Sequence, residues 1–135
     1  MKPDIKNQLT QAAIVAMNNA YAPYSNFSVG AALLCADETI ITGCNVENLS
    51  FGLTQCAEKV AICTAVAQGK KNFTCIAIAA DTNEVISPCG ACRQVLAEFN
   101  PDMLILSVNK NGKSQEFRLA ELLPRPTTGI LNRKT

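Results

Sequence analysis

The chain has 135 residues, the length of one ordinary domain with a core of its own, and we expect residues 1–135 to form a single domain. Hydrophobic residues make up 48% of the sequence and charged residues only 17%, a balance that leaves apolar surface to be buried between subunits. The net charge of +1 gives no electrostatic footprint for nucleic acid, and there is no apolar run of about 18 residues that would predict a membrane span.

The sequence contains seven cysteines and no histidine. An odd number of cysteines without a recognisable secretory signal is typical of reduced thiols, so we expect a cytoplasmic protein. The lack of histidine removes the usual proton shuttle and the commonest metal ligand. Acid–base chemistry must therefore fall to a carboxylate, Lys, Cys or Tyr, and a transition metal to thiolates.

Hydrophobic periodicity predicts four helices and five strands along the chain. The predicted helices cover residues 5–20, 57–68, 90–99 and 119–123. The predicted strands cover residues 29–35, 40–44, 73–80, 103–108 and 114–118. The order α-β-β-α-β-α-β-β-α predicts an α/β fold in which helices cover both faces of a sheet and hairpins add antiparallel pairs.

Local signals refine these elements. Asp4 is the expected cap of the first helix, and Gly69 is the expected left-handed cap of the second. The helix over residues 57–68 is apolar almost all round, which places it in the middle of the fold or of an assembly. The continuous apolar strand over residues 73–80 indicates that both of its faces are covered. Residues 45–55 are expected to form a polar loop.

Two short motifs place three cysteines and a carboxylate at predicted helix starts, Cys56-Ala57-Glu58 and Pro88-Cys89-Gly90-Ala91-Cys92. A helix N-terminus carries partial positive charge and free N–H groups, which favour thiolate over thiol. We therefore interpret Cys56, Cys89 and Cys92 as ligands of a catalytic zinc, which takes three protein ligands and leaves a place for water.

The alternative is a structural site with Cys44 or Cys63 as a fourth ligand, although both lie in apolar runs, as Cys35 and Cys75 do, and are typical of core cysteines. Glu58 is placed to move the protons of a metal-bound water. Its alternative role is that of a first-turn carboxylate that stabilises the helix dipole.

With Tyr24-Ser25-Asn26-Phe27 and Gly43-Cys44-Asn45-Val46-Glu47-Asn48, these motifs resemble the small homo-oligomeric branch of the cytidine deaminase family. The resemblance implies a three-layer α-β-α fold with a mixed five-stranded sheet, one Zn²⁺ per subunit and a homotetramer. It also implies hydrolytic deamination of cytidine and deoxycytidine to uridine and deoxyuridine plus ammonia, in pyrimidine salvage. In that reaction zinc-bound hydroxide attacks C4 and Glu58 shuttles protons.

The resemblance extends to substrate contacts. Asn45 and Glu47 match the pair that binds ribose hydroxyls, and Phe27 matches the aromatic that packs on the base. The backbones of Ala57, Ser87 and Cys89 would meet the polar edge of the base. The alternatives are a solvated loop for Asn45 and Glu47, and core packing for Phe27.

Two basic residues near the cysteines, Lys59 and Arg93, are expected to offset the negative charge of the thiolates. The family usually has Arg where Lys59 stands, and Lys cannot make the planar bidentate contact that Arg makes. Arg93 has the alternative role of a structural tie near the thiolates.

Two further positions depart from the family pattern. Many members have Tyr where Phe51 stands, and many carry a Phe shortly after the motif that reads Glu121-Leu122-Leu123-Pro124 here. In the oligomer that Phe reaches a neighbouring site. This chain has no aromatic residue there, and Ile130 or Leu131 is the candidate substitute.

The resulting interpretation is a deaminase of free nucleosides, with no nucleic-acid or membrane partner. A deaminase of a cytosine-containing nucleoside antibiotic such as blasticidin S is a rival, and Asn45 and Glu47, which suit a sugar diol, count against it. A polynucleotide editor would need aromatic platforms and a basic groove, whereas aromatic residues are 5% of the chain. A zinc-stabilised binding module without catalysis is the alternative from another class.

Overall fold

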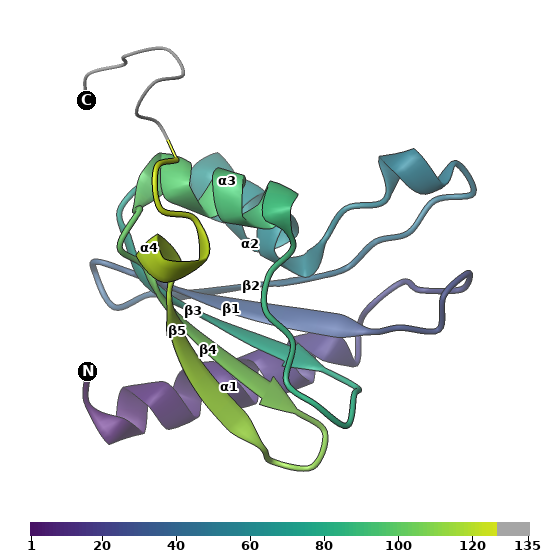
Figure 1. Ribbon diagram of the computed structural model, residues 1–135, viewed down its shortest axis with the longest axis horizontal. Coiled ribbons are helices and arrows are strands. Elements are labelled where there is room, and N and C mark those ends of the chain that lie inside the picture. Colours follow the sequence, from purple (N-terminus) through teal and green to yellow (C-terminus); the bar gives the residue numbers. More distant parts are fainter. Residues whose placement is uncertain (127–135) are drawn as a thin grey trace.

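The computed structural model describes residues 1–126, which form a sheet with helices on both faces (Figure 1). The helices are α1 (Pro3–Met17), α2 (Ala57–Ala67), α3 (Gly90–Phe99) and α4 (Leu119–Leu122), with a short 3-10 helix, η1 (Phe51–Leu53). The strands are β1 (Val29–Cys35), β2 (Ile40–Cys44), β3 (Phe73–Ala80), β4 (Leu104–Asn109) and β5 (Ser114–Arg118). The predicted α/β class and the predicted order of elements are confirmed.

The sheet is mixed, with strand order β2-β1-β3-β4-β5. Its antiparallel pairs are β1–β2, β1–β3 and β4–β5, and β3 and β4 run parallel. A parallel pair needs a crossover connection, and here α3 supplies it. The last pair of the parallel ladder joins Ala80 to Asn109, so the carboxyl ends of β3 and β4 lie side by side.

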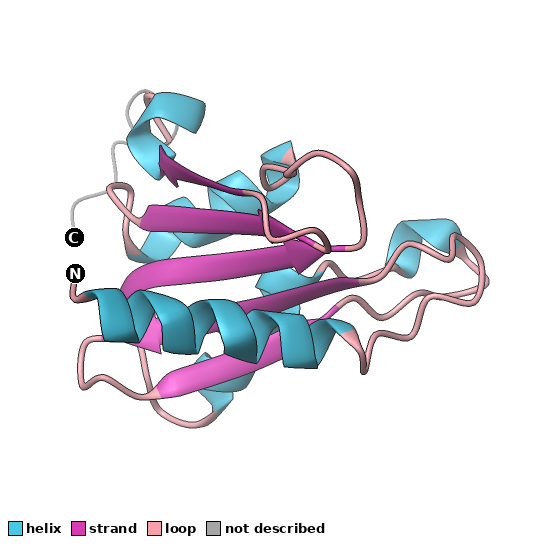
Figure 2. Cartoon of the chain, turned by 90° about the horizontal axis from the view of Figure 1, so that it is seen from below, coloured by secondary structure: helices cyan, strands magenta, loops and turns pink. Residues whose placement is uncertain are grey.

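Each face of the sheet has its own apolar core. Leu33, Ile76 and Ile105 belong to the core under α2, α3 and α4. Their neighbours Ala77 and Leu106 point the other way, into the core under α1. Figure 2 shows α1 lying across that second face. The three-layer α-β-α arrangement is therefore confirmed.

Two glycines let helices approach the sheet closely. A Cβ at Gly30 would lie 2.1 Å from Ala13 O of α1. A Cβ at Gly43 would lie 2.5 Å from Ala61 N and 2.7 Å from Ala57 O of α2. Because real Cβ contacts are not this short, both positions require glycine, and Gly43 sets the position of the first turns of α2.

Some boundaries differ from the prediction. The first helix ends at Met17 rather than residue 20, because Asn18 and Asn19 already make i to i−3 bonds and Tyr21 N donates to Asn45 O. The expected Asp4 cap is wrong, since Lys2 is the N-cap residue and makes no side-chain cap bond.

Other expectations hold in part. Gly69 does follow α2 in a left-handed conformation, with φ of 85°. The fourth strand lies one residue later than predicted. The loop over residues 45–55 is not simply polar, because it contains η1 and exposes Leu49 and Phe51. Helix α2 buries one side and exposes Val66 on the other. In the described part of the chain, no helix is long and apolar enough to cross a membrane.

Candidate metal centre and its cavity

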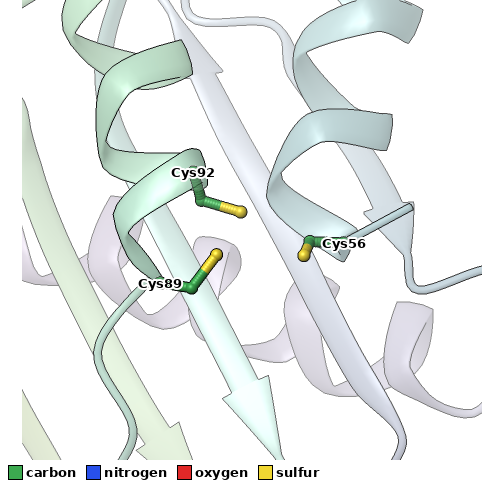
Figure 3. Close-up of side chains that lie close together, drawn as sticks. All are labelled: Cys56, Cys89 and Cys92. Atoms are coloured by element: carbon green, nitrogen blue, oxygen red, sulfur yellow. The ribbon is translucent and has the colours of Figure 1, made fainter. Parts of the chain in front are cut away.

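The three cysteines of the two motifs meet at the starts of α2 and α3. Cys56 is the N-cap residue of α2, Cys89 is that of α3, and Cys92 lies in the first turn of α3. Their sulfur atoms all lie within 4.8 Å of one another. Figure 3 shows the three side chains turned toward a common point between the two helices.

The local backbone explains why these positions can share a site. Cys56 and Cys89 have extended N-cap conformations (φ −73°, ψ 152° and φ −66°, ψ 169°), so each side chain stands at the mouth of its helix rather than along it. The two N-termini supply partial positive charge to the sulfur atoms from two directions. Residues 33 apart in sequence therefore share one electrostatic environment.

The cluster has one thiol that gives up its proton readily. A hydrogen bond from Cys92 lowers the pKa of Cys56 to about 6, with help from Cys89 and from the charge of Lys59. The same hydrogen bond, with burial, raises the pKa of Cys92. Cys56 is thus the more acidic of these two thiols.

The donor set fits zinc. Thiolates bound at about 2.3 Å to one tetrahedral zinc lie about 3.8 Å apart, so sulfurs already within 4.8 Å need only small adjustments. Among residues 1–126 the cluster has these three members, and neither Cys44 nor Cys63 joins them. Three sulfur ligands leave a fourth position free, as in catalytic zinc sites.

Glu58 lies in the first turn of α2, beside the cluster, and is only 5% exposed. Burial raises the pKa of its carboxyl, and the negative charge of Cys56 acts in the same direction. A buried carboxyl with a raised pKa gives up its proton less readily than an exposed one, which suits a group that accepts a proton and passes it on.

A cavity of about 410 Å³ opens beside these groups. Its walls include the predicted site residues Phe27, Asn45, Glu47, Cys56, Ala57, Glu58, Ser87 and Cys89. Cys92 lies behind the cavity and is fully buried. Cys56, Glu58 and Cys89 thus face the space that a substrate would occupy.

Four other residues also line the cavity, Ser25, Val29, Thr54 and Ile86. Ser25 stands in one of the motifs quoted above and could have been found there. The other three carry no chemical signature, since their role depends only on which way the folded chain turns them. A separate cavity of about 260 Å³ lies at the far end of α2, beside the ion pair of Lys70 and Asp37, away from the cysteine cluster.

Asn45 is not a solvated loop residue, since it is only 7% exposed. Its Nδ2 donates to Phe27 O at 2.7 Å, and its Oδ1 accepts from Val29 N at 2.9 Å. It therefore fixes the backbone on both sides of Ser28, where the chain enters β1. Phe27 is 39% exposed and lines the cavity rather than packing in the core.

Glu47 holds the preceding turn. Its Oε1 accepts from Tyr24 N at 3.0 Å and Ser25 N at 3.1 Å, and its Oε2 accepts from Ser25 Oγ. The Ser25 hydroxyl bond is the main cause that lowers the pKa of Glu47, so this carboxylate stays ionised at neutral pH.

The two basic residues differ in position. Arg93 donates to Pro88 O at 2.8 Å, to Leu122 O at 3.1 Å and to Ser87 Oγ at 3.2 Å, so it ties the cysteine loop to α4. Lys59 acts on Cys56 through its charge. Neither residue lines the cavity.

The positions that depart from the family pattern lie elsewhere. Phe51 is 72% exposed and meets the ring of Tyr24 edge-on, with 5.8 Å between ring centroids. Ile130 and Leu131 lie outside the residues that the structure describes.

Comparison with known proteins agrees with this geometry. The family model described as the cytidine and deoxycytidylate deaminase zinc-binding region matches residues 3–108. The chain is 48% identical over 120 residues to a cytidine deaminase of Halalkalibacterium halodurans, covering 88% of this chain and 91% of that protein. It is 50% identical over 110 residues to a cytidine deaminase of Sporosarcina psychrophila, covering 81% of each.

A solved structure gives the same result. The crystal structure of cytidine deaminase from Burkholderia pseudomallei is 43% identical, with a TM-score of 0.86, and the match covers 92% of this chain and 98% of that one. Both the sequence and the fold are thus shared over nearly the whole length. The chain belongs to the cytidine and deoxycytidylate deaminase family of enzymes.

Proposed function

We propose that this enzyme is a zinc-dependent hydrolase that converts cytidine and deoxycytidine to uridine and deoxyuridine with release of ammonia. The observation that carries the proposal is that three cysteine sulfur atoms lie within 4.8 Å of one another and that two of these cysteines, Cys56 and Cys89, line one cavity together with the buried Glu58. The names of the relatives at 48% and 50% identity support the same reaction.

Cys56, Cys89 and Cys92 would hold one Zn²⁺ per subunit. Bound there, the metal would supply a water made more acidic and more nucleophilic for attack on the base. Glu58 would take one proton from that water and pass it to the ring nitrogen. It would then take the proton of the hydroxyl formed at C4 and give it to the leaving amine, so that ammonia and the C4 carbonyl result. The raised pKa of Glu58 suits both the acceptance and the release of a proton.

The base would stack near Phe27, with its polar edge toward the backbones of Ala57, Ser87 and Cys89, all of which line the cavity. Lys59 would offset part of the negative charge of the thiolates, as its effect on the pKa of Cys56 supports. Arg93 would also offset this charge, while its hydrogen bond to Pro88 O holds the loop before α3 in place.

The hydrogen-bond capacity of Asn45 and Glu47 supports activity on both sugars. Glu47 already accepts three hydrogen bonds, and a carboxylate has about four lone-pair sites, so one remains. Asn45 retains one N–H and one lone pair. One sugar hydroxyl can therefore donate a hydrogen bond to Glu47 and accept one from Asn45. These two bonds use the remaining lone pair of Glu47 and the remaining N–H of Asn45, so a second hydroxyl cannot make the same two bonds. Loss of the 2′-hydroxyl should cost little.

A deoxycytidylate deaminase is the second candidate, because the family model covers both substrates. The cavity lining argues against it, since it includes Glu47 and Glu58 and no Lys or Arg among the described residues. A 5′-phosphate brings negative charge, which favourable sites meet with Arg or Lys. The lining therefore favours an uncharged nucleoside.

We further propose a homotetramer formed by a single-domain chain. The segment between β2 and α2, which contains η1, projects from the rest of the molecule (Figure 1). In this segment Leu49, Phe51 and Leu53 have exposed apolar side chains, as Val66 has on α2, which supports burial between subunits. Sedimentation that finds a stable, active monomer would contradict the assembly. The seven unpaired cysteines suit a reducing compartment such as the cytoplasm, where pyrimidine salvage would take place.

The direct test is a substrate panel with zinc measured on the same sample. The panel contains cytidine, deoxycytidine, cytosine, deoxycytidylate, blasticidin S and a cytosine-containing single strand. Turnover of each compound is measured by the loss of absorbance and by the release of ammonia. We expect turnover of the two nucleosides with similar kcat/KM values and little turnover of the others. A preference for deoxycytidylate or blasticidin S, or a zinc-free active enzyme, would refute the assignment.

A further inference from the structure

The segment over residues 81–89 forms one wall of the cavity but has little structure of its own. It connects β3 to α3 and contributes Ile86, Ser87 and Cys89 to the lining. Within residues 1–126, residues 82–88 make no backbone–backbone hydrogen bond. Its position therefore comes from the packing of Ile86 and Pro88 against the core and from polar side chains that reach it from elsewhere in the fold.

The turn between β4 and β5 supplies three such contacts. Asn109 Nδ2 donates to Asn83 O at 2.5 Å. Lys113 pairs with Glu84 at 2.7 Å, and Lys110 pairs with Asp81 at 3.4 Å. The two ion pairs are exposed to solvent, so each holds the segment more weakly than a buried hydrogen bond does. Asn109 is only 2% exposed, so its hydrogen bond is the principal contact.

The side chain of Asn109 joins two structures. Its Oδ1 accepts from Asn111 N at 3.0 Å and from Lys113 N at 2.9 Å, which closes the turn. Its Nδ2 is left to hold the segment. Because the oxygen anchors the amide plane to the turn, the direction of the nitrogen is fixed.

The other end of the segment is held independently. Arg93 donates to Pro88 O and Ser87 Oγ, next to Cys89. The stretch between the two attachments contains Ile86 and the start of the Ser87 backbone. If the contact at Asn83 is lost, this stretch can move while Cys89 stays in place.

We propose that Asn109 is a positioning residue for substrate binding, which sets the cavity wall at Ile86 and Ser87 through the segment over residues 81–89. This inference rests on the proposed function, because it assumes that nucleoside occupies this cavity. Asn109 lies one residue beyond the region that the family model matches. It touches neither the cysteines nor the cavity, so it acts only through the segment.

The test compares Asn109→Asp with Asn111→Asp. The first variant keeps the oxygen that closes the turn and removes the donor to Asn83 O. The second adds the same charge to the same turn at an exposed residue. For Asn109→Asp we expect KM for cytidine to rise about three- to tenfold, the range of one lost hydrogen bond, with kcat within about twofold and zinc retained. Amide hydrogen exchange should speed up in residues 82–88. Asn111→Asp should leave all four measurements unchanged.

Unchanged KM and exchange in Asn109→Asp would overturn the inference, as would equal effects in both variants or loss of zinc. Should Asn109→Asp fail to fold, the double variant Asp81→Asn with Glu84→Gln weakens the same attachment from the surface. It should raise KM about twofold and speed exchange in residues 82–88, and no change in either would overturn the inference. If the wild type does not turn over cytidine, the proposed function fails, whereas faster exchange would still uphold the attachment.

Discussion

Two cysteines, Cys75 on one face of the sheet and Cys56 on the other, stand in opposite surroundings. On the α1 face, Cys75 is fully buried among aliphatic side chains, and burial raises the pKa of its thiol to about 12. On the other face, Cys56 stands at the start of α2 beside two further thiols, and its pKa is lowered to about 6. The residue type is the same, and the surroundings make one a packing group and the other a candidate ligand.

The difference extends to the helices. One helix, α1, covers its face with apolar side chains such as Leu9 and Ala13. The opposite face is covered by α2 and α3, whose N-termini converge and bring a buried Glu58 with them. The reactive groups thus lie where the N-termini of α2 and α3 meet. The face covered by α1 contributes packing to the stability of the fold.

Replacing one cysteine on each face should give the largest difference between the two faces. Cys56→Ser removes a proposed zinc ligand, so we expect zinc content and deamination to fall to background after dialysis against a chelator. Cys75→Ala should keep zinc and activity and lower the free energy of unfolding by about 1 kcal/mol, since it removes one buried sulfur. Metal analysis, uridine formation and urea unfolding on both variants provide the measurements. Full zinc in Cys56→Ser, or loss of zinc in Cys75→Ala, would contradict the comparison.

Replacing Glu58 tests whether the reactive face is catalytic or merely binds metal. Glu58→Gln keeps the shape and removes the proton carrier, so kcat should fall roughly 10²- to 10⁴-fold while zinc is retained. Steady-state kinetics and metal analysis measure the two quantities. A variant as active as wild type would instead support a zinc-stabilised module without catalysis.

The two close-approach glycines extend the comparison to packing. Gly30→Ala should destabilise the protein by about 3 kcal/mol, because its Cβ would meet α1 backbone at 2.1 Å. Gly43→Ala should cost about 2 kcal/mol, with its closest contact at 2.5 Å, and should also lower kcat because it pushes on the turns of α2 that follow Cys56. Urea unfolding and kinetics under folding conditions separate the two effects. Equal losses of activity would mean that the faces are not independent.

The smallest effect concerns pH. The pKa of Cys75 is raised from 9.0 to about 12, so its neutral, buried thiol stabilises the fold below pH 9. That contribution is lost as pH rises from 9 toward 12, because the unfolded chain ionises first. The stability gap between wild type and Cys75→Ala should therefore narrow over this range. Urea unfolding at pH 8 and pH 10 measures this difference in unfolding free energy. An equal difference at the two pH values would show that burial does not raise the pKa of the Cys75 thiol.

Much of the fold and of the candidate site could be predicted from the sequence. Periodicity located the strands over residues 29–35 and 73–80 and the helix over residues 90–99 with their observed bounds. The metal cluster was predictable because Cys56 and Cys89 each precede a helix, a feature visible in local sequence. Such signals depend on hydrogen bonds and side-chain spacing within a few residues.

The sequence did not reveal that Asn45 and Glu47 hold the chain from Tyr24 to Val29 in place. It also did not reveal that Thr54 and Ile86 line the cavity, or that Asn109 holds the segment before α3. Each of these depends on segments that meet only after the strands have taken the order β2-β1-β3-β4-β5. The sequence by itself determined which elements form and which side chains are able to bind metal. The tertiary structure decided which of them face one cavity, because strand order and loop path are set by packing of the whole chain rather than by neighbouring residues.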